Sequence, residues 1–361
     1  MANKDKIIDR AAGAVVGALI GDALGLGPHW YYDLNRMRRD YGPWIDGYTD
    51  PKPGRYHAGL KAGDLSQTGL ITLELLRSVV EKGGYDEEDF TRRLDEKFLR
   101  QMDGTAYSGP GGYTNQSIRE LYEARVKQGK PWGKTGDYAD TTEGAERAVV
   151  IAARYAMSPG EGAQMIARNV RLTQIDPFVA ALSTGYCVIV SALIRGEPFD
   201  DKLAAKLYSM VENGELPFTH AVLAEKKGTY VHDPTAASAW LPYPDALLFP
   251  SHIWAAAKDP DALIEPAWKV SLVYGMPCSI VCVLPAAYYL AARFQDNFEQ
   301  AVLHAVNGGG QNMSRAMLAG AMVGAQVGLS GIPERFIAGL SGGDEVVDLA
   351  TRLGKSLTAE I

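Results

Sequence analysis

The sequence is poor in cysteine, and it lacks blocks of like charge and an unbroken apolar segment near its start. Its three cysteines form no C-x-x-C pair, so we expect buried thiols of a reducing compartment rather than disulfides or zinc ligands. The net charge is -7 and charges of both signs are interspersed, so the sequence has no basic patch that would attract nucleic acid or an anionic membrane. The apolar stretch 11–27 is interrupted by Asp22 and by glycines, which is typical of a packed helix rather than a signal peptide. We therefore expect a cytoplasmic protein without a nucleic-acid or membrane partner.

The alternation of apolar and polar residues that marks half-buried β-strands is also missing. Apolar residues instead recur at helical spacing, and polar loops rich in glycine and proline separate these segments. No internal repeat divides the sequence. We therefore predict an all-α fold in a single compact domain over residues 1–361. Helices are predicted over residues 4–24, 66–82, 86–102, 115–127, 145–157, 160–170, 178–195, 200–213, 262–294, 299–306 and 314–327.

The first predicted helix carries Gly13, Gly17 and Gly21 at intervals of four residues. Residues spaced by four lie on one face of a helix, so these glycines form a ridge of small residues. The pattern predicts that another helix packs closely against this face.

An aromatic and titratable cluster, His29, Trp30 and Tyr32, follows directly after the first predicted helix. Loops in such positions often carry ligand contacts. The alternative is that the aromatic side chains fill the core while His29 hydrogen-bonds a carbonyl. The sequence leaves both interpretations open.

Two glycine-framed helix starts present short polar side chains. Three glycines, 308–310, precede Gln311, Asn312 and Ser314, and a second polar segment, 63–69, opens the predicted helix 66–82. Glycine lets the backbone approach a ligand closely, and a helix N-terminus favours anionic groups. Each start is either a binding surface or an ordinary turn and cap.

Three further histidines, His220, His232 and His252, lie in a proline-containing segment. Their spacing is irregular and exceeds what one helix or hairpin would bring together, so we predict no metal site there.

Several motifs resemble those of a known family. Residues 17–25 read G-A-L-I-G-D-A-L-G, which is similar to the family's G-A-L-x-G-D-A-L-G, and residues 173–177 resemble its T-H-x-D-P motif. Residues 306–310 and 319–321 resemble the late N-x-G-G-D-T-D-T and A-G-A signature. The chain thus resembles, over nearly its whole length, the ADP-ribosylglycohydrolases, which include the dinitrogenase-reductase-activating glycohydrolases and the J1 crystallins. The resemblance implies an orthogonal bundle of helices.

Both magnesium motifs of that family are altered in this sequence. Residues 66–69, S-Q-T-G, stand where the family has T-D-D-T, and residues 311–314, Q-N-M-S, stand where it has D-T-D-T. All four aspartates are missing, and neutral oxygens with a thioether do not replace carboxylates as Mg²⁺ ligands. We therefore predict no metal ligands and no cofactor. The sequence leaves open a single weakly held cation near Asp64.

The resemblance also suggests catalytic residues. An ungapped count puts His29 where the family has an acidic residue, as in the J1 crystallin branch. Histidine titrates near neutrality and suits a general acid or base that works without metal. Glycosidic cleavage passes through an oxocarbenium-like centre that a nearby carboxylate stabilises, and the candidates are Asp22, Asp33 and Asp64. The alternative for Asp22 is a structural role, as a buried cap at a helix end.

Two functions are compatible with these residues. The first is a hydrolase that cleaves an N- or O-glycosidic bond of an ADP-ribosyl or ribosyl-type small molecule without the family's magnesium pair. The alternative is a non-catalytic member that binds a nucleotide or sugar, or that serves structurally as the J1 crystallins do. The sequence does not indicate an oligomeric state. The predicted ligand-binding residues are Trp30, Tyr32, Ser66, Gln67, Thr68, Asn307, Gly309, Gly310, Gln311, Asn312 and Ser314.

Overall fold

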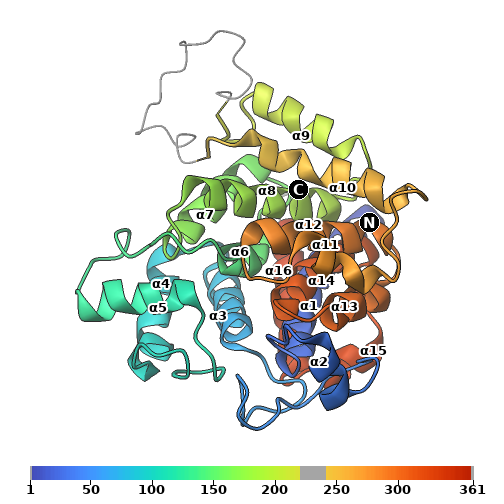
Figure 1. Ribbon diagram of the computed structural model, residues 1–361. Coiled ribbons are helices and arrows are strands. Elements are labelled where there is room, and N and C mark those ends of the chain that lie inside the picture. Colours follow the sequence, from blue (N-terminus) through green and yellow to red (C-terminus); the bar gives the residue numbers. More distant parts are fainter. Residues whose placement is uncertain (1, 220–240, 359–361) are drawn as a thin grey trace, which may run out of the picture.

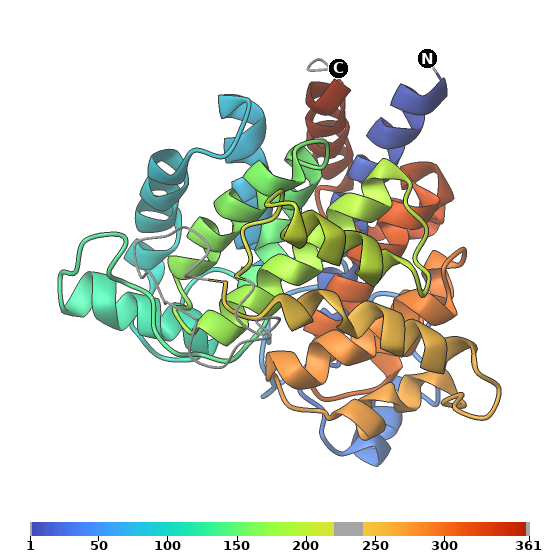
Figure 2. The same cartoon turned by 90° about the horizontal axis from the view of Figure 1, so that it is seen from above.

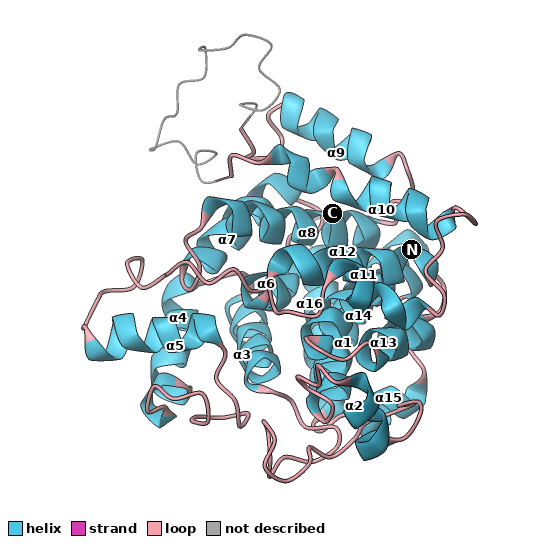
Figure 3. Cartoon of the chain, viewed as in Figure 1, coloured by secondary structure: helices cyan, strands magenta, loops and turns pink. Residues whose placement is uncertain are grey.

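The computed structural model describes residues 2–219 and 241–358, and helices dominate these ranges (Figure 1). Within them no residue belongs to a β-strand, and Figure 3 shows only helices joined by loops, which confirms the predicted all-α fold. The α-helices of the described ranges are α1 (Ala2–Leu26), α2 (Leu34–Tyr41), α3 (Gln67–Lys82), α4 (Glu87–Lys97), α5 (Gln116–Tyr122), α6 (Glu143–Arg154), α7 (Pro159–Arg171), α8 (Pro177–Arg195), α9 (Leu203–Glu212), α10 (Phe249–Lys258), α11 (Val270–Tyr274), α12 (Ile280–Arg293), α13 (Phe298–Asn307), α14 (Asn312–Val327), α15 (Glu334–Gly339) and α16 (Gly343–Thr358).

The helix pair α1 and α14 forms the centre of the molecule (Figure 1). The glycine ridge of α1 faces the backbone of α14, as the sequence predicted. A Cβ atom added at Gly17 would lie 2.4 Å from the carbonyl oxygen of Gly320, and one at Gly21 would lie 2.2 Å from that of Ala316. Only glycine permits this separation, because real Cβ contacts are never so short. The two backbones are therefore in direct contact.

The other helices pack around this pair in layers. α13 and α16 flank it, and the free ends of α1 and α16 lie near each other in both views (Figures 1 and 2). α4 and α5 lie beyond α3, on the side away from α13 and α15 (Figure 1). α8 is long and apolar enough to cross a membrane, but 89% of its apolar window is buried within the protein. This burial is typical of the core helix of a folded domain.

Most predicted helices are present, and the differences have physical causes. The predicted helix 262–294 is interrupted, because Gly275 takes a positive φ and the segment 275–279 leaves the helix before α12 begins. The sequence pattern missed α2, α10, α15 and α16. His220 and His232 lie outside the described residues, whereas His252 is exposed on α10.

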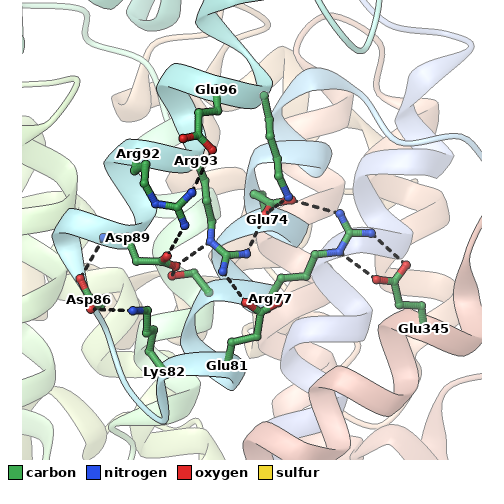
Figure 4. Close-up of polar contacts among 12 residues, drawn as sticks. Glu74, Arg77, Glu81, Lys82, Asp86, Asp89, Arg92, Arg93, Glu96 and Glu345 are labelled. Atoms are coloured by element: carbon green, nitrogen blue, oxygen red, sulfur yellow. Dashed lines mark hydrogen bonds and ion pairs between the residues drawn. The ribbon is translucent and has the colours of Figure 1, made fainter.

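An ion-pair network joins α3, α4 and α16 (Figure 4). Arg93 of α4 contacts Glu74 of α3 at 2.9 Å and Asp89 of its own helix at 2.6 Å. Arg77 contacts Glu74 at 3.1 Å and extends the network to Glu345 of α16 at 2.8 Å. Glu74 and Asp89 are buried, so each needs its arginine partners to offset the cost of desolvation.

We predict that Asp89→Asn destabilises the protein at neutral pH. Burial alone raises the pKa of Asp89, but hydrogen bonds from Ser78, Arg92 and Arg93 outweigh it and lower the pKa to about 2. The stabilisation that the charged form of Asp89 provides is fully present above the pKa of Asp89 in the unfolded chain, and it is lost as pH falls toward 2. The free energy of unfolding should fall by about 1–2 kcal/mol at pH 7.

Urea unfolding at pH 7 and at pH 3 measures this effect. The loss in Asp89→Asn should be smaller at pH 3, because the wild-type carboxylate then has lost part of its advantage. The control is Asp348→Asn, whose side chain is 66% exposed in its pair with Arg352. Equal losses at both pH values would contradict the role assigned to the Asp89 charge.

Candidate functional site

The start of α3 binds a buried carboxylate from α1. Asp22 accepts hydrogen bonds from the backbone N–H of Ser66 at 2.8 Å and from its hydroxyl at 2.5 Å. A side chain at position 69 would collide with the Asp22 carboxylate, so Gly69 makes room for it. Burial raises the pKa of Asp22 to about 6, although the bonds from Ser66 and Gly69 act in the opposite direction. The structure thus places Asp22, a predicted catalytic residue, against Ser66, a predicted ligand-binding residue.

The glycine turn before α14 binds other parts of the chain. Gly309 and Gly310 have φ of 63° and 57°. The N–H of Gly310 donates to the carbonyl of Tyr31 at 2.7 Å, and the N–H of Gln311 donates to that of Met276 at 2.9 Å. The turn thus positions Gln311 by backbone contacts with two loops, and its glycines provide close approach between segments of the protein itself.

Gln311 joins the aromatic loop after α1 to the start of α14. Its Oε1 accepts the indole N–H of Trp30 at 2.5 Å and lies 3.1 Å from Nε2 of His29. Its Nε2 donates to the hydroxyl of Ser314 at 2.6 Å. The side chains of His29, Gln311 and Ser314 are 2%, 5% and 1% exposed. The structure therefore brings together three residues that the sequence had placed in one site.

A second buried carboxyl, Glu146 of α6, approaches the start of α14. Its Oε1 accepts the hydroxyl proton of Thr142, and the hydroxyl of Ser314 also hydrogen-bonds it. Burial raises the pKa of Glu146 to about 8, with further contributions from the negative charges of Glu143 and Asp22. The pKa of Glu143 is also raised by burial. Each altered helix start thus has a carboxyl group supplied by another helix.

The sequence gave a weak signal for Glu143 and Glu146. Both lie in the first turn of α6, where acidic residues are common because they interact favourably with the helix dipole. From the sequence, acidic residues here are therefore more readily explained as structural than as catalytic. The signal that could have revealed a site is the pairing of two carboxyls, three residues apart, in a helix that is otherwise entirely apolar apart from its arginines.

Aromatic rings connect the buried histidine to the surface. The ring of Trp30 lies 5.3 Å from that of His29 and 5.1 Å from that of Tyr56, measured between centroids. Tyr56 stacks on Tyr107 at 5.5 Å, and Tyr107 is 71% exposed. Tyr113 packs edge-on against Trp30 at 5.0 Å. Such rings suit the stacking of a planar base or the face of a sugar.

Two predicted catalytic carboxylates have structural partners instead. Asp33 caps α2 by accepting the backbone N–H groups of Asn35 and Arg36, and these bonds lower its pKa. Asp64 accepts the N–H of Lys61 and the hydroxyl of Ser341 at 2.7 Å. The structure does not bring either carboxylate into hydrogen-bond contact with His29.

Some of the remaining predicted binding residues lie at the site, and others hydrogen-bond the segments around it. Thr68 lines a small cavity with Asn115 and Glu143, and it accepts a hydrogen bond from Asn115 at 3.3 Å. Tyr32 is half exposed. Three others hold neighbouring segments: Asn307 bonds the backbone of Ile45, Gln67 bonds Pro110 and Thr114, and Asn312 bonds the carbonyl of Val306.

The two helix starts do not carry a donor set suited to a magnesium pair. The side chains that they offer are neutral, and both oxygens of Asp22 already accept hydrogen bonds from Ser66. Within residues 2–219 and 241–358, no group of three or more His, Cys, Asp or Glu side chains is arranged to hold a metal ion. The residues present do not fit the dinuclear site that the fold implies, and metal independence stays a prediction.

Comparison with known proteins extends the resemblance to the whole chain. A family model described as ADP-ribosylglycohydrolase matches residues 3–360. A protein of Archaeoglobus fulgidus is 26% identical over 340 residues, which cover 94% of each chain. Crystallin J1A of Tripedalia cystophora is 26% identical over 379 residues, covering 98% of this chain and 99% of the crystallin. The solved structure of an ADP-ribosylglycohydrolase-related protein complex matches with a TM-score of 0.63 and 20% identity, over 98% of this chain and 99% of that chain.

Proposed function

Because the chain belongs to the ADP-ribosylglycohydrolase family, we propose that it is a hydrolase that cleaves an N- or O-glycosidic bond of an ADP-ribosyl or ribosyl-type small molecule. We further propose that it does so without the family's magnesium pair, since the altered helix starts offer neutral side chains. Its chemistry then depends on the groups that surround those starts.

The side chains of His29, Gln311, Ser314 and Glu146 adjoin one another in one buried site, and this arrangement carries the proposal because it places a base and an acid together. Burial lowers the pKa of His29 well below its usual value and raises that of Glu146 to about 8. At pH 7 His29 is neutral and accepts protons, whereas Glu146 holds a proton that it can donate. Pairs of groups with such divergent pKa values are typical of acid and base catalysis.

In the proposed reaction these two groups act on opposite sides of the glycosidic bond. The bond breaks as the leaving atom takes the proton of Glu146. The oxygen of water bonds to the anomeric carbon as His29 takes a proton from that water. Asp22, whose pKa is raised by burial to about 6, is mostly ionised at pH 7 and stabilises the positive charge on the sugar.

The aromatic rings around Trp30 support a ligand of the nucleotide or sugar class. Trp30, Tyr56 and Tyr107 extend from the buried histidine to the surface, and aromatic faces bind bases and sugars with little need for specific hydrogen bonds. We propose that the leaving group or base of an ADP-ribosyl compound stacks along this path.

We predict that His29→Ala loses most hydrolytic activity. Hydrolysis of ADP-ribosyl-arginine, ADP-ribosyl-serine and O-acetyl-ADP-ribose should be measured with magnesium and with a chelator. Removal of a general base should lower kcat/KM by about 10²- to 10⁴-fold. The wild-type rate should be equal in both buffers. His252→Ala is the matched control, because His252 is an exposed histidine on α10.

Turnover that requires added magnesium would contradict the metal-independent mechanism, and full activity of His29→Ala would contradict the role of the histidine.

A non-catalytic function is the second candidate, and one observation favours it. His29, Gln311, Ser314 and Glu146 are each no more than 5% exposed, so the site is closed to a substrate in this conformation. Absence of turnover, together with a melting temperature raised by ADP-ribose, would support a binding protein.

A further inference from the structure

Two buried histidines form a direct hydrogen-bonded pair beside the candidate site. Nδ1 of His29 lies 2.8 Å from Nε2 of His57, and Nδ1 of His57 lies 2.7 Å from the carbonyl oxygen of Gly111. At the other end, Nε2 of His29 lies 3.1 Å from Oε1 of Gln311. The two rings thus span three successive hydrogen-bonding gaps. His57 was not among the residues that the sequence indicated.

Both ends of this series are acceptors by chemical necessity. A peptide carbonyl such as that of Gly111 can only accept. The amide of Gln311 could in principle be turned over, but its atom nearest Trp30 faces an indole N–H, which can only donate. That atom is therefore the oxygen, and it accepts. The three contacts between these two acceptors are Gly111 O to His57 Nδ1, His57 Nε2 to His29 Nδ1, and His29 Nε2 to Gln311 Oε1. Each contact, or gap, needs one N–H proton to be a hydrogen bond, so three protons are required, whereas two neutral imidazoles supply two.

A neutral pair must leave one gap without a proton, and there two lone pairs face each other. The gaps measure 2.7, 2.8 and 3.1 Å, and repulsion is smallest across the longest, between His29 and Gln311. Both rings then carry their proton on Nδ1: His57 donates to Gly111, and His29 donates to His57. The lone pair of His29 Nε2 remains directed at the candidate site.

We propose that His57 is a positioning residue that holds His29 in its Nδ1–H tautomer, so that Nε2 of His29 faces the site as a proton acceptor. For a neutral pair, the tautomer follows from the three distances. Its use in catalysis rests on the proposed function, in which His29 accepts the proton of the attacking water. A substrate or water that donates to Nε2 would replace the unfavourable contact with Gln311.

The surroundings favour a neutral pair over a cationic one. Arg55 lies beside the pair, where its Nη2 donates to the backbone carbonyls of His29 and Trp30 at 3.2 and 2.8 Å. Tyr113 packs edge-on against both imidazole rings. Among the described residues, no carboxylate hydrogen-bonds either ring. Burial lowers the pKa of His57 to about 4, and burial, His57 and Arg55 lower that of His29.

The backbone at this site provides independent support. Trp30 and His57 have φ of 60° and 63°, and they are the only residues other than glycine with positive φ in the described ranges. This conformation is unfavourable for bulky side chains, and it persists only where the surrounding contacts determine it. The strain falls on the two residues that hold the ends of the His29 network: Trp30 orients Gln311, and His57 bonds His29 itself.

The test is the tautomeric state of His29 in the full chain. Histidine labelled with ¹⁵N gives two-bond proton–nitrogen correlation spectra that distinguish Nδ1–H from Nε2–H rings, and no substrate is needed. At pH 7.5 the signals of His29 and His57, assigned by single substitution, should both show the Nδ1–H tautomer. In His57→Gly the proton of His29 should move to Nε2, because position 57 then offers no side-chain acceptor and Oε1 of Gln311 remains.

Glycine is the chosen replacement because it adopts positive φ without strain and adds no hydrogen-bonding side chain, so the variant should keep its fold. His252→Ala serves as the control and should leave the His29 tautomer unchanged. An Nε2–H tautomer of His29 in the wild-type protein, or the same tautomer with and without His57, would overturn the proposal. Confirmed tautomers without any glycoside hydrolysis would instead leave this inference standing and remove the proposed function.

Discussion

Replacing Glu146 by glutamine is expected to stabilise the protein at pH 8, although the residue is buried and hydrogen-bonded. Burial raises the pKa of Glu146 to about 8 in the folded state, and its unfolded value is near 4.3. Between these values the folded state holds a proton that the unfolded state releases, so stability falls as pH rises. Glutamine is neutral throughout, and the variant should therefore gain roughly 2–4 kcal/mol at pH 8.

Chemical unfolding of both proteins between pH 5 and pH 9 measures this gain. The two free energies of unfolding should be similar near pH 5 and should diverge as pH rises toward 8. Glu96→Gln is the control, since the Glu96 side chain is 41% exposed, and its effect should stay within about 0.5 kcal/mol. If the free energies of unfolding of wild type and Glu146→Gln changed with pH in the same way, Glu146 would be ionised in the folded protein. It could then not serve as the proposed general acid.

Replacing Gly17 by valine is expected to destabilise the fold more than any substitution in the candidate site. A Cβ at this position would lie 2.4 Å from the carbonyl oxygen of Gly320 and 2.9 Å from the ring of Phe298. Helix propensity alone favours larger residues over glycine within a helix by about 0.5–1 kcal/mol, so the two effects have opposite signs. The clash with backbone should win, because α1 and α14 would have to separate, at a cost of about 3 kcal/mol or more.

Thermal unfolding of Gly17→Val, with circular dichroism to report helix content, tests this expectation. Gly47→Ala is the control: Gly47 lies in a loop, its φ is not positive, and an added Cβ would meet only the end of Arg335 at 3.7 Å. An unchanged melting temperature for Gly17→Val would mean that the two central helices are not in backbone contact.

Sequence patterns predicted the fold well wherever a helix has one apolar face and a defined start. The predicted helix 178–195 appears as α8, which begins after the Asp176 cap and ends at Gly196. Prediction failed in the segment 262–294, where the apolar composition is helical but Gly275 and the following residues turn the chain. It also missed short helices such as α2, whose single buried residue, Met37, gives no periodic signal.

For the site, the sequence was informative about residues at helix ends and silent about contacts between distant loops. Asp22, His29 and Gln311 were all placed in one region because motifs at fixed positions marked them. His57 was missed because it lies in a long irregular loop and meets His29 only through tertiary contacts. Glu146 was missed because an acidic residue in a first helical turn has an ordinary structural explanation. Its burial, which changes that explanation, is a property of the fold.

The direct contact between α1 and α14 bears on how such a site can change over evolutionary time. The close contact continues to Gly25, where an added Cβ would lie 2.3 Å from Cα of Met313 at the start of α14. The residues that differ from the family's magnesium motifs lie at the starts of α3 and α14, and among them Met313 meets α1 at Gly25. A side chain at Gly13, Gly17 or Gly21 would meet the backbone of the facing segment, so we expect substitutions to be rare along this face of α1 even in a lineage that has abandoned catalysis.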